Sequence, residues 1–237
     1  MSRQKLKKFA ELQTFPNVYD NLDVRDPANT VLNGQIVGIK GKWGSEHFKN
    51  DNPITLELAC GRGEYAVALG KMFPERNFIG VDVKGSRIHK GAKEALEAGL
   101  TNVAFLRTRI EQIEHFFVKN EVSEIWITFP DPFLKERKSN KRLTSEQFLN
   151  RYRKFLQPNG IVHLKTDSPD LYDFTLDICQ NAVEGRNPDS IGKGCELLFK
   201  DSDIHSKPLI MNELSVQTYY EKANIAKSTI KYVRFKI

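Results

Sequence analysis

The chain has 237 residues, of which 40% are hydrophobic and 28% are charged, and its formal net charge is +6. This length and composition are typical of one α/β domain with additions, or at most two small domains, around a sizeable core. No apolar run approaches the roughly 20 residues that span a bilayer, and the basic start of the chain lacks the apolar segment of a signal peptide. The positive charge favours a polyanionic partner.

The three cysteines, Cys60, Cys179 and Cys195, are scattered along the chain and form no CxxC pair. Their spacing does not match that of metal ligands, so we expect no metal site. An odd number of dispersed cysteines fits a reducing compartment. We therefore expect a cytoplasmic protein that does not associate with a membrane.

Residues 1–50 are expected to form a basic, partly mobile arm of irregular structure, followed by a single domain over residues 51–237. Lysines are spread along this arm, and glycine or asparagine marks turns at 33–34 and 41–44. Its end, around Trp43, is a candidate to lie over a ligand. For residues 1–20 a plain solvated extension is the simpler prediction.

From Pro53 onward, short apolar runs alternate with longer amphipathic stretches. The apolar runs predict strands at 54–60, 77–83, 102–106, 124–129 and 161–166. The amphipathic stretches predict helices at 64–73, 86–98, 110–119, 144–156 and 169–182. Gly99 suits the end of the second helix, and Thr144 with Gln147 predicts a capping box at the fourth. This alternation predicts an α/β fold with a doubly wound, mostly parallel sheet.

The end of the chain predicts two further strands, at 194–200 and 228–237, after a loop at 183–194. Residues 229–237 alternate between apolar and polar side chains, which is typical of an antiparallel edge strand with one covered face. The predicted sheet therefore ends in an antiparallel C-terminal edge.

Two glycines and a carboxylate follow the first two predicted strands. Gly61 and Gly63 come after the first strand, and Asp82 ends the second strand, 19 residues after Gly63. Ligands of doubly wound sheets bind at the carboxyl ends of the strands, where an acidic side chain can accept hydrogen bonds from ribose hydroxyls. Glycine lets the backbone approach such a ligand closely. The pattern predicts a nucleoside ligand, either a dinucleotide or S-adenosylmethionine.

Two observations favour S-adenosylmethionine. Glu64-Tyr65-Ala66 supplies no third glycine, which weakens a pyrophosphate site. Glu57, inside the first strand, brings a carboxylate that suits a sulfonium with its amino group and would oppose a pyrophosphate. A purely structural strand–turn–helix is the alternative.

The chain around Asp131 is the most distinctive part of the sequence. An apolar run that ends at Phe129 is followed by two prolines, which stop the strand and stiffen the chain on both sides of Asp131. A cluster of cations follows, and it consists of Lys135, Arg137, Lys138, Lys141 and Arg142. A carboxylate at the end of a buried strand, next to groups that can bind phosphates, indicates chemistry on a nucleic-acid base. The alternative is a turn followed by a solvated charged loop.

Together these segments resemble the tRNA (guanine-N7-)-methyltransferase family. The resemblance rests on residues 56–63, on Gly80-Val81-Asp82, on the Phe-Pro-Asp-Pro-Phe-x-Lys-x-Arg block at 129–137 with 141–143, and on the T-x-x-E element at 218–221. It covers roughly residues 53–236. It implies a Rossmann-like enzyme that transfers a methyl group from S-adenosylmethionine to N7 of a guanine in the variable loop of tRNA. Such an enzyme would act as a monomer or a homodimer.

The resemblance also assigns roles by motif position. The methyl donor would be held by Glu57, Gly61, Gly63, Asp82 and Arg109, and Asp131 would lie at the reaction centre. The target nucleotide would be contacted by Lys135, Asp167, Thr218 and Glu221. Independently of the resemblance, the cation run next to Asp131 would bind the RNA phosphates, through Arg137, Lys138, Lys141 and Arg142 together with Lys135. The structural alternatives are a helix cap for Asp167 and an ordinary helix start for Thr218 and Glu221.

Three positions depart from the family pattern. Phe133 stands where Trp is usual, which keeps an aromatic ring, and Ala59-Cys60 replaces the common pair before Gly61. Arg109 stands where Asp or Asn is frequent near the adenine. Because Arg offers only donors, it cannot accept a hydrogen bond from the adenine amino group. Backbone groups or stacking would then recognise the adenine, and a phosphate-facing surface position is the alternative for Arg109.

The expected reaction needs no strong base, because N7 of guanine carries a free lone pair and its methylation releases no proton. Orientation and electrostatic stabilisation should then provide the catalysis. Three other functions stay open at this point. They are a methyltransferase acting on another RNA or a small purine, a non-catalytic RNA-binding subunit, and a nicotinamide-dependent oxidoreductase.

Overall fold

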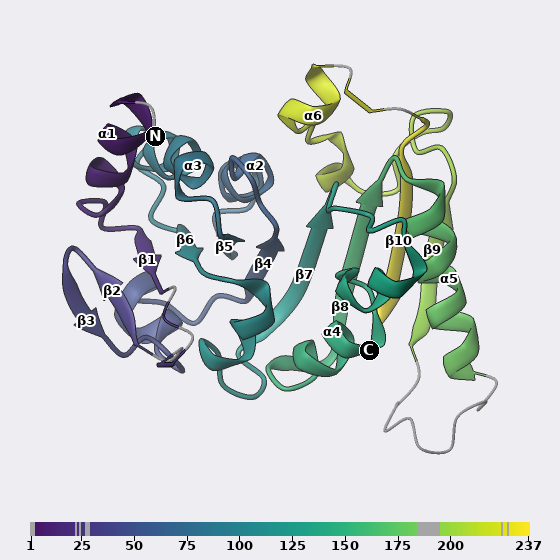
Figure 1. Ribbon diagram of the computed structural model, residues 1–237, viewed down its shortest axis with the longest axis horizontal. Helices are drawn as coiled ribbons and strands as arrows, with labels where there is room; N and C mark the ends of the chain where they lie inside the picture. Colours follow the sequence, from purple (N-terminus) through teal and green to yellow (C-terminus); the bar gives the residue numbers. More distant parts are fainter. Residues whose placement is uncertain are drawn as a thin grey trace.

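The computed structural model describes residues 3–21, 23, 25–26, 29–183, 195–223, 225–226 and 228–237. These residues form a ten-stranded sheet in the order β3-β2-β1-β6-β5-β4-β7-β8-β10-β9, with helices packed around it (Figure 1). Within the described residues, no helix combines the length and apolar character needed to cross a bilayer.

The centre of the sheet is parallel and doubly wound, which confirms the predicted fold class. Its strands are β4 (Ile54–Leu58), β5 (Asn77–Asp82), β6 (Val103–Arg107), β7 (Val122–Thr128) and β8 (Leu156–Thr166). From β4 the chain adds β5 and β6 on one side and then returns to add β7 and β8 on the other. The carboxyl ends of β4 and β7 therefore meet at a topological switch point, where sheets of this kind bind ligands.

Helices cover both faces of the sheet. The helical elements between β4 and β9 are α2 (Glu64–Met72), α3 (Gly85–Glu97), η2 (Ile110–His115), η3 (Glu136–Lys141), α4 (Glu146–Tyr152) and α5 (Pro169–Val183). Side chains of α2 and α3 pack with Phe78 and Phe105 in one hydrophobic cluster, whereas Leu56 and Leu58 pack with α4 and α5 in another. Because neighbouring strand residues point to opposite faces, Glu57 faces the α2 side, away from Leu56 and Leu58.

Three local predictions differ from the structure. The helix predicted at 110–119 is the short 3₁₀ helix η2, and α4 is shorter than predicted, starting after Ser145. The predicted capping box is wrong, because the Thr144 hydroxyl lies 2.7 Å from that of Thr175 and caps no helix. Residues 158–160 lie inside β8, where Asn159 adopts a left-handed conformation (φ 65°) and the pairing with β7 shifts register.

The C-terminal strands β9 (Glu196–Asp201) and β10 (Lys231–Lys236) are antiparallel to their neighbours, which confirms the predicted antiparallel edge. The edge strand itself is β9, because β10 lies between β8 and β9. The prediction that residues 229–237 form the outermost strand is therefore wrong. Between them lie η4 (Asn212–Ser215) and α6 (Tyr219–Lys222). The predicted loop falls on residues 184–194, outside the described residues.

The first 50 residues are more regular than expected. They contain α1 (Arg3–Leu12), β1 (Val18–Asp20), β2 (Thr30–Leu32), β3 (Gln35–Val37) and the π-helical turn η1 (Trp43–Phe48). The prediction of irregular structure is wrong for these elements, because β1 pairs in parallel with β6 and extends the central sheet. The division of the chain at residue 50 stays a prediction.

Trp43 does not lie over a ligand. Its side chain is fully buried, its ring stacks on Phe117 with centroids 5.6 Å apart, and its indole N–H donates to the Phe116 carbonyl at 2.9 Å. A large ring with its one polar group satisfied is a core residue. The turn η1 therefore anchors this part of the chain to the segment before β7.

Candidate active site

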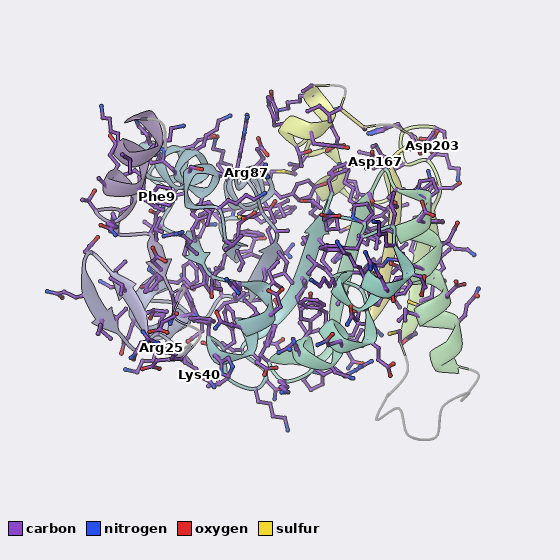
Figure 2. All side chains as sticks on the ribbon, viewed as in Figure 1. Phe9, Arg25, Lys40, Arg87, Asp167 and Asp203 are labelled. Atoms are coloured by element: carbon purple, nitrogen blue, oxygen red, sulfur yellow. The ribbon has the colours of Figure 1, made fainter. Side chains whose placement is uncertain are left out.

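The residues singled out by the sequence gather at the carboxyl ends of the parallel strands. In Figure 1, β4, β7 and β8 run toward the upper side of the view, where α2, α3 and α6 lie. Figure 2 labels Arg87 and Asp167 on this side. The chain crosses this edge at the glycine turn after β4, at the end of β5, at the proline-flanked segment after β7 and at Asp167 after β8.

The two glycines of the turn have different roles. Both have positive φ, 55° at Gly61 and 71° at Gly63, which favours glycine over any other residue. A Cβ atom at Gly63 would lie 2.4 Å from the ring of Phe105, so this glycine allows the turn to pack on the sheet. A Cβ atom at Gly61 would meet no atom within 4 Å. Gly61 therefore leaves space at the strand ends for another molecule.

Glu57 lies beneath this turn and does not line a surface. Its carboxylate accepts a hydrogen bond from the Ala66 backbone N–H at 2.9 Å and one from the Thr128 hydroxyl at 3.3 Å. Burial raises the pKa of Glu57 to about 8, although the hydrogen bond from Ala66 opposes the shift. Glu57 thus links the first turn of α2 to the end of β7. It can affect a ligand only indirectly, through the glycine turn or through Thr128.

Asp82 fixes the glycine turn from the neighbouring strand. One carboxylate oxygen accepts from the Gly61 N–H at 2.9 Å, and the other accepts from the Lys84 N–H at 2.7 Å. Each carboxylate oxygen has two lone pairs, so both can still accept a further hydrogen bond. The carboxylate is therefore held in place with acceptor capacity left for hydroxyl groups of a ligand.

Asp131 lies exposed on the segment that follows β7. Its carboxylate accepts from the Phe133 N–H at 3.1 Å, which closes a small turn around Pro132. Phe129 and Phe133, on either side, adopt left-handed conformations with φ of 47° and 42°. Such conformations are unfavourable for aromatic residues and occur preferentially at functional sites.

Arg142 supports this segment from below. Its guanidinium donates to the carbonyls of Pro132 at 3.1 Å and Phe133 at 3.3 Å and lies 4.4 Å from the centre of the Phe174 ring. Only 5% of Arg142 is exposed, so the prediction that it binds an RNA phosphate is not supported. The sequence places it in the cation run, but its side chain turns inward because two carbonyls of the tight turn need donors.

Two adjoining hollows open at this edge. The first, the Asp131 cleft, has a volume of about 590 Å³, and Asp82, Arg109 and Asp131 all line it. The second, the Tyr219 pocket, has a volume of about 260 Å³ and is lined by Gly61, Thr128, Thr218, Tyr219 and Tyr220. Ala59, Arg87 and Phe129 line both hollows. The site is therefore one surface with two compartments that meet at the ends of β4 and β7.

The C-terminal segment covers the Tyr219 pocket. Thr218 and Glu221 form a capping box at the start of α6, with the Thr218 N–H donating to the Glu221 carboxylate at 2.9 Å. The Arg62 guanidinium lies 3.6 Å from the centre of the Tyr219 ring. The Tyr220 hydroxyl donates to Asp167 at 3.3 Å. These contacts bring predicted residues from β8 and from the end of the chain to the glycine turn.

A buried lysine connects the same segment to the sheet. The Lys165 ammonium lies 2.8 Å from the Glu221 carboxylate and donates to the Val216 carbonyl at 3.0 Å and the Tyr65 hydroxyl at 3.1 Å. Its side chain is fully buried, and burial lowers the pKa of Lys165 although Glu221 opposes the shift. Sequence reasoning missed this residue. The available signal is a lysine inside a strand predicted to be buried, close to its carboxyl end.

The remaining cations of the predicted phosphate-binding set are exposed. Lys135, Arg137, Lys138 and Lys141 lie in or next to η3, and Lys141 lines the Asp131 cleft. Arg109 lies across the same cleft, exposed, at the start of η2. The structure thus surrounds Asp82 and Asp131 with a positively charged rim.

Comparison with known proteins identifies the family. The sequence model of a family described as putative methyltransferase matches residues 51–228. A tRNA (guanine-N(7)-)-methyltransferase of Bacteroides fragilis is 47% identical over 99% of this chain and 86% of the relative. The chain belongs to the tRNA (guanine-N7-)-methyltransferase family. A member from Porphyromonas gingivalis is 46% identical over 94% of this chain and 86% of its own, and one from Clostridium novyi is 38% identical over 71% and 73%.

Solved structures of other methyltransferases share the fold of this tRNA (guanine-N7-)-methyltransferase family member. The 16S rRNA methyltransferase KamB superposes with a TM-score of 0.61 at 14% identity, over 86% of this chain and 96% of KamB. A 16S rRNA (adenine(1408)-N(1))-methyltransferase from Catenulisporales acidiphilia, solved with its cosubstrate SAM, gives a TM-score of 0.55 at 14% identity over 85% and 93%. At this identity the likeness extends to the fold alone.

Proposed function

We propose that this protein transfers a methyl group from S-adenosylmethionine to N7 of a guanine in tRNA, in the variable loop, and so forms 7-methylguanosine. One observation carries the proposal. Asp82 and Asp131, from two different strand ends, line a single cleft in a chain that belongs to the tRNA (guanine-N7-)-methyltransferase family.

The glycine turn and its surroundings suit the cosubstrate. The open space at Gly61 admits a ligand next to the backbone, and Asp82 has acceptors left for the hydroxyls of a ribose. Gly63 and Glu57 act indirectly, because one packs the turn on Phe105 and the other holds α2. Arg109 is in reach of the adenosine side of the cleft, and as a donor it can contact ring nitrogens but not the amino group.

When bound, S-adenosylmethionine supplies an electrophilic methyl group on a sulfonium. The chain needs to add no strong base, because N7 of guanine carries its own lone pair. The purine becomes positively charged as it is methylated, and the exposed carboxylate of Asp131 stabilises that charge. Its turn with Phe133 holds it in place, so little reorganisation is needed during the reaction.

The target guanine would lie where the Tyr219 pocket meets the Asp131 cleft, next to the cosubstrate at the glycine turn. Thr218 lines this pocket, and Glu221 and Asp167 lie just behind it, bound to Thr218 and Tyr220 respectively. Carboxylates can accept hydrogen bonds from the amino and imino groups of guanine. The pocket meets the Asp131 cleft at Phe129, so a base held there faces the methyl donor.

The exposed cations Lys135, Arg137, Lys138 and Lys141 would bind tRNA phosphates around the target nucleotide, and this would make binding strongly dependent on salt. An RNA substrate and three unpaired cysteines also favour a cytoplasmic enzyme. The enzyme would act as a monomer or homodimer. A non-catalytic RNA-binding subunit is the second candidate, but it would not need an exposed carboxylate in the cleft that adjoins the Tyr219 pocket.

One assay tests the proposal directly. The purified protein is incubated with unmodified tRNA and radiolabelled S-adenosylmethionine, and the RNA is digested to nucleosides. We expect label in 7-methylguanosine. Label in another nucleoside would overturn the assigned target atom, and binding of tRNA without any label would favour the non-catalytic subunit.

A further inference from the structure

A third hollow, lined largely by basic side chains, adjoins the active site. This α3 groove has a volume of about 730 Å³ and lies against α3 and α1, with Lys8, Arg62, Arg87, Lys90 and Lys93 among its lining residues. Glu94 and Glu97 also line it, so positive charge is in excess. A basic groove is suited to a polyanion. The cations around η3 are not part of this groove, and Lys141 is the one among them that lines the Asp131 cleft.

The α3 groove is continuous with the active site. Arg87 lines the groove, the Asp131 cleft and the Tyr219 pocket, and Arg62 lines the groove and the Tyr219 pocket. Figure 2 shows Arg87 at the upper edge of the molecule, on the same side as Asp167. A ligand with one nucleotide in the active site could therefore extend along the groove without crossing another part of the protein.

The cations continue from the active site into the groove. Lys84, Arg87, Lys90 and Lys93 follow one another every three residues along α3 and its start. Three residues of α-helix advance by about 4.5 Å, and Arg87, Lys90 and Lys93 all line the groove, so one polyanion can contact all three. Lys84 lines the Asp131 cleft and Lys93 lines the groove, so the series leads from one to the other.

These cations are available to a partner. Lys84, Arg87, Lys90 and Lys93 are exposed. Lys93 has a loose contact of 3.7 Å with Glu97, and within the described part of the chain no carboxylate forms an ion pair with Arg87 or Lys90. Exposed cations without acidic partners keep their charge for a ligand.

The wall that α1 contributes is fixed in place. The Glu11 carboxylate of α1 lies 2.7 Å from the ring nitrogen Nε2 of His89 on α3. Phe9 lies over the Arg107 guanidinium at 4.9 Å, and Leu12 is buried. Lys8 therefore belongs to a docked helix and faces the groove from a defined position, which gives the basic N-terminus a role that its sequence alone leaves open.

We propose that the α3 groove binds the sugar–phosphate backbone of a part of tRNA that lies outside the target nucleotide. This inference rests on the proposed function, because it takes tRNA as the polyanion. The groove would raise the affinity for the RNA and help to place it. Lys90 and Lys93 would take no part in methyl transfer itself.

The test compares two double variants. K90Q/K93Q removes two groove cations, and K40Q/K119Q removes two exposed cations away from the active-site edge. Lys40 lies at the lower side in Figure 2, and Lys119 comes shortly before β7 begins. Equilibrium tRNA binding is measured as a function of salt, together with KM for tRNA, kcat and the affinity for S-adenosylmethionine.

We expect K90Q/K93Q to raise the Kd and KM for tRNA several-fold and to make the salt dependence shallower by roughly 1.5 in log–log slope. Its kcat at saturating tRNA and its affinity for S-adenosylmethionine should equal those of the wild type. Equal tRNA affinity and salt slope in K90Q/K93Q and K40Q/K119Q would overturn the proposal. Because binding is measured separately from turnover, a wild type that binds tRNA but does not methylate it would refute the proposed reaction alone.

Discussion

The contact between Lys165 and Glu221 should stabilise the fold and position the C-terminal segment at the same time. The ammonium and the carboxylate lie 2.8 Å apart, and their side chains are 0% and 4% exposed. Removing one partner of such a buried pair leaves the other charge uncompensated, which costs about 3–5 kcal/mol. Against a typical total stability of roughly 5–15 kcal/mol, Lys165→Met should therefore lower the denaturation midpoint strongly.

A double-mutant cycle separates the charge effect from lost packing. Glu221→Gln keeps the capping box with Thr218, because Gln also serves at that position. We expect Lys165→Met/Glu221→Gln to lose much less stability than the sum of the single variants, as measured by guanidinium unfolding. The control is Lys71→Met, which removes a surface contact of 2.9 Å with Glu94; exposed pairs contribute at most about 1 kcal/mol. Single-variant losses that add to within about 0.5 kcal/mol would refute the reasoning.

The same cycle has a functional readout. Because Lys165 holds Glu221 behind the Tyr219 pocket, Lys165→Met should raise KM for tRNA at a temperature where the variant is folded. Its affinity for S-adenosylmethionine should stay near that of the wild type, since the glycine turn and Asp82 are not in contact with Lys165. A loss of cosubstrate affinity equal to the loss in tRNA affinity would indicate general unfolding instead.

Four further variants test the site. Asp131→Ala should abolish methyl transfer and leave cosubstrate affinity by calorimetry nearly unchanged, because the carboxylate is exposed and supports only the turn to Phe133; normal turnover would remove Asp131 from the reaction centre. Gly61→Ala should weaken cosubstrate binding, whereas Gly63→Ala should mainly lower the melting temperature, because only the second Cβ would collide with Phe105. Between pH 4.5 and about 8 the unfolded chain ionises Glu57 while the folded protein keeps it protonated, so wild-type stability should fall over this window by an amount on the order of several kcal/mol. Glu57→Gln should remove that part of the fall in unfolding titrations, and parallel pH profiles for both proteins would contradict the assigned pKa.

The sequence predicts those parts of the fold and of the site that depend on local patterns and motif positions. The five parallel strands follow apolar runs that are visible one at a time, and the strand order of doubly wound sheets brings their ends together. For this reason the sequence places Asp82 and Asp131, 49 positions apart, at strand ends on the same edge of the sheet, and in the structure both line one cleft.

The sequence was insufficient where a residue's role depends on what it contacts across the fold. The strand β1 has only three residues, and it is a strand because it pairs with β6. Arg142 looks like its neighbours in the cation run, yet two carbonyls of the Asp131 turn draw it inward. Glu57 was predicted to face the ligand, but its neighbours on α2 and β7 enclose it. Neither the periodicity of the sequence nor its motifs predict these long-range contacts.

The pairing of β1 with β6 has a consequence for how the chain is made. Val18 lies opposite Phe105, so on the ribosome the first strand is finished long before its partner has been translated. Contacts of such sequence separation form slowly, because a long loop must close first. Until then the outer side of β6 offers an unpaired row of backbone donors and acceptors, which neighbouring nascent chains could join. A truncation that removes β1 would leave this edge of β6 permanently unpaired, and we expect such a variant to self-associate.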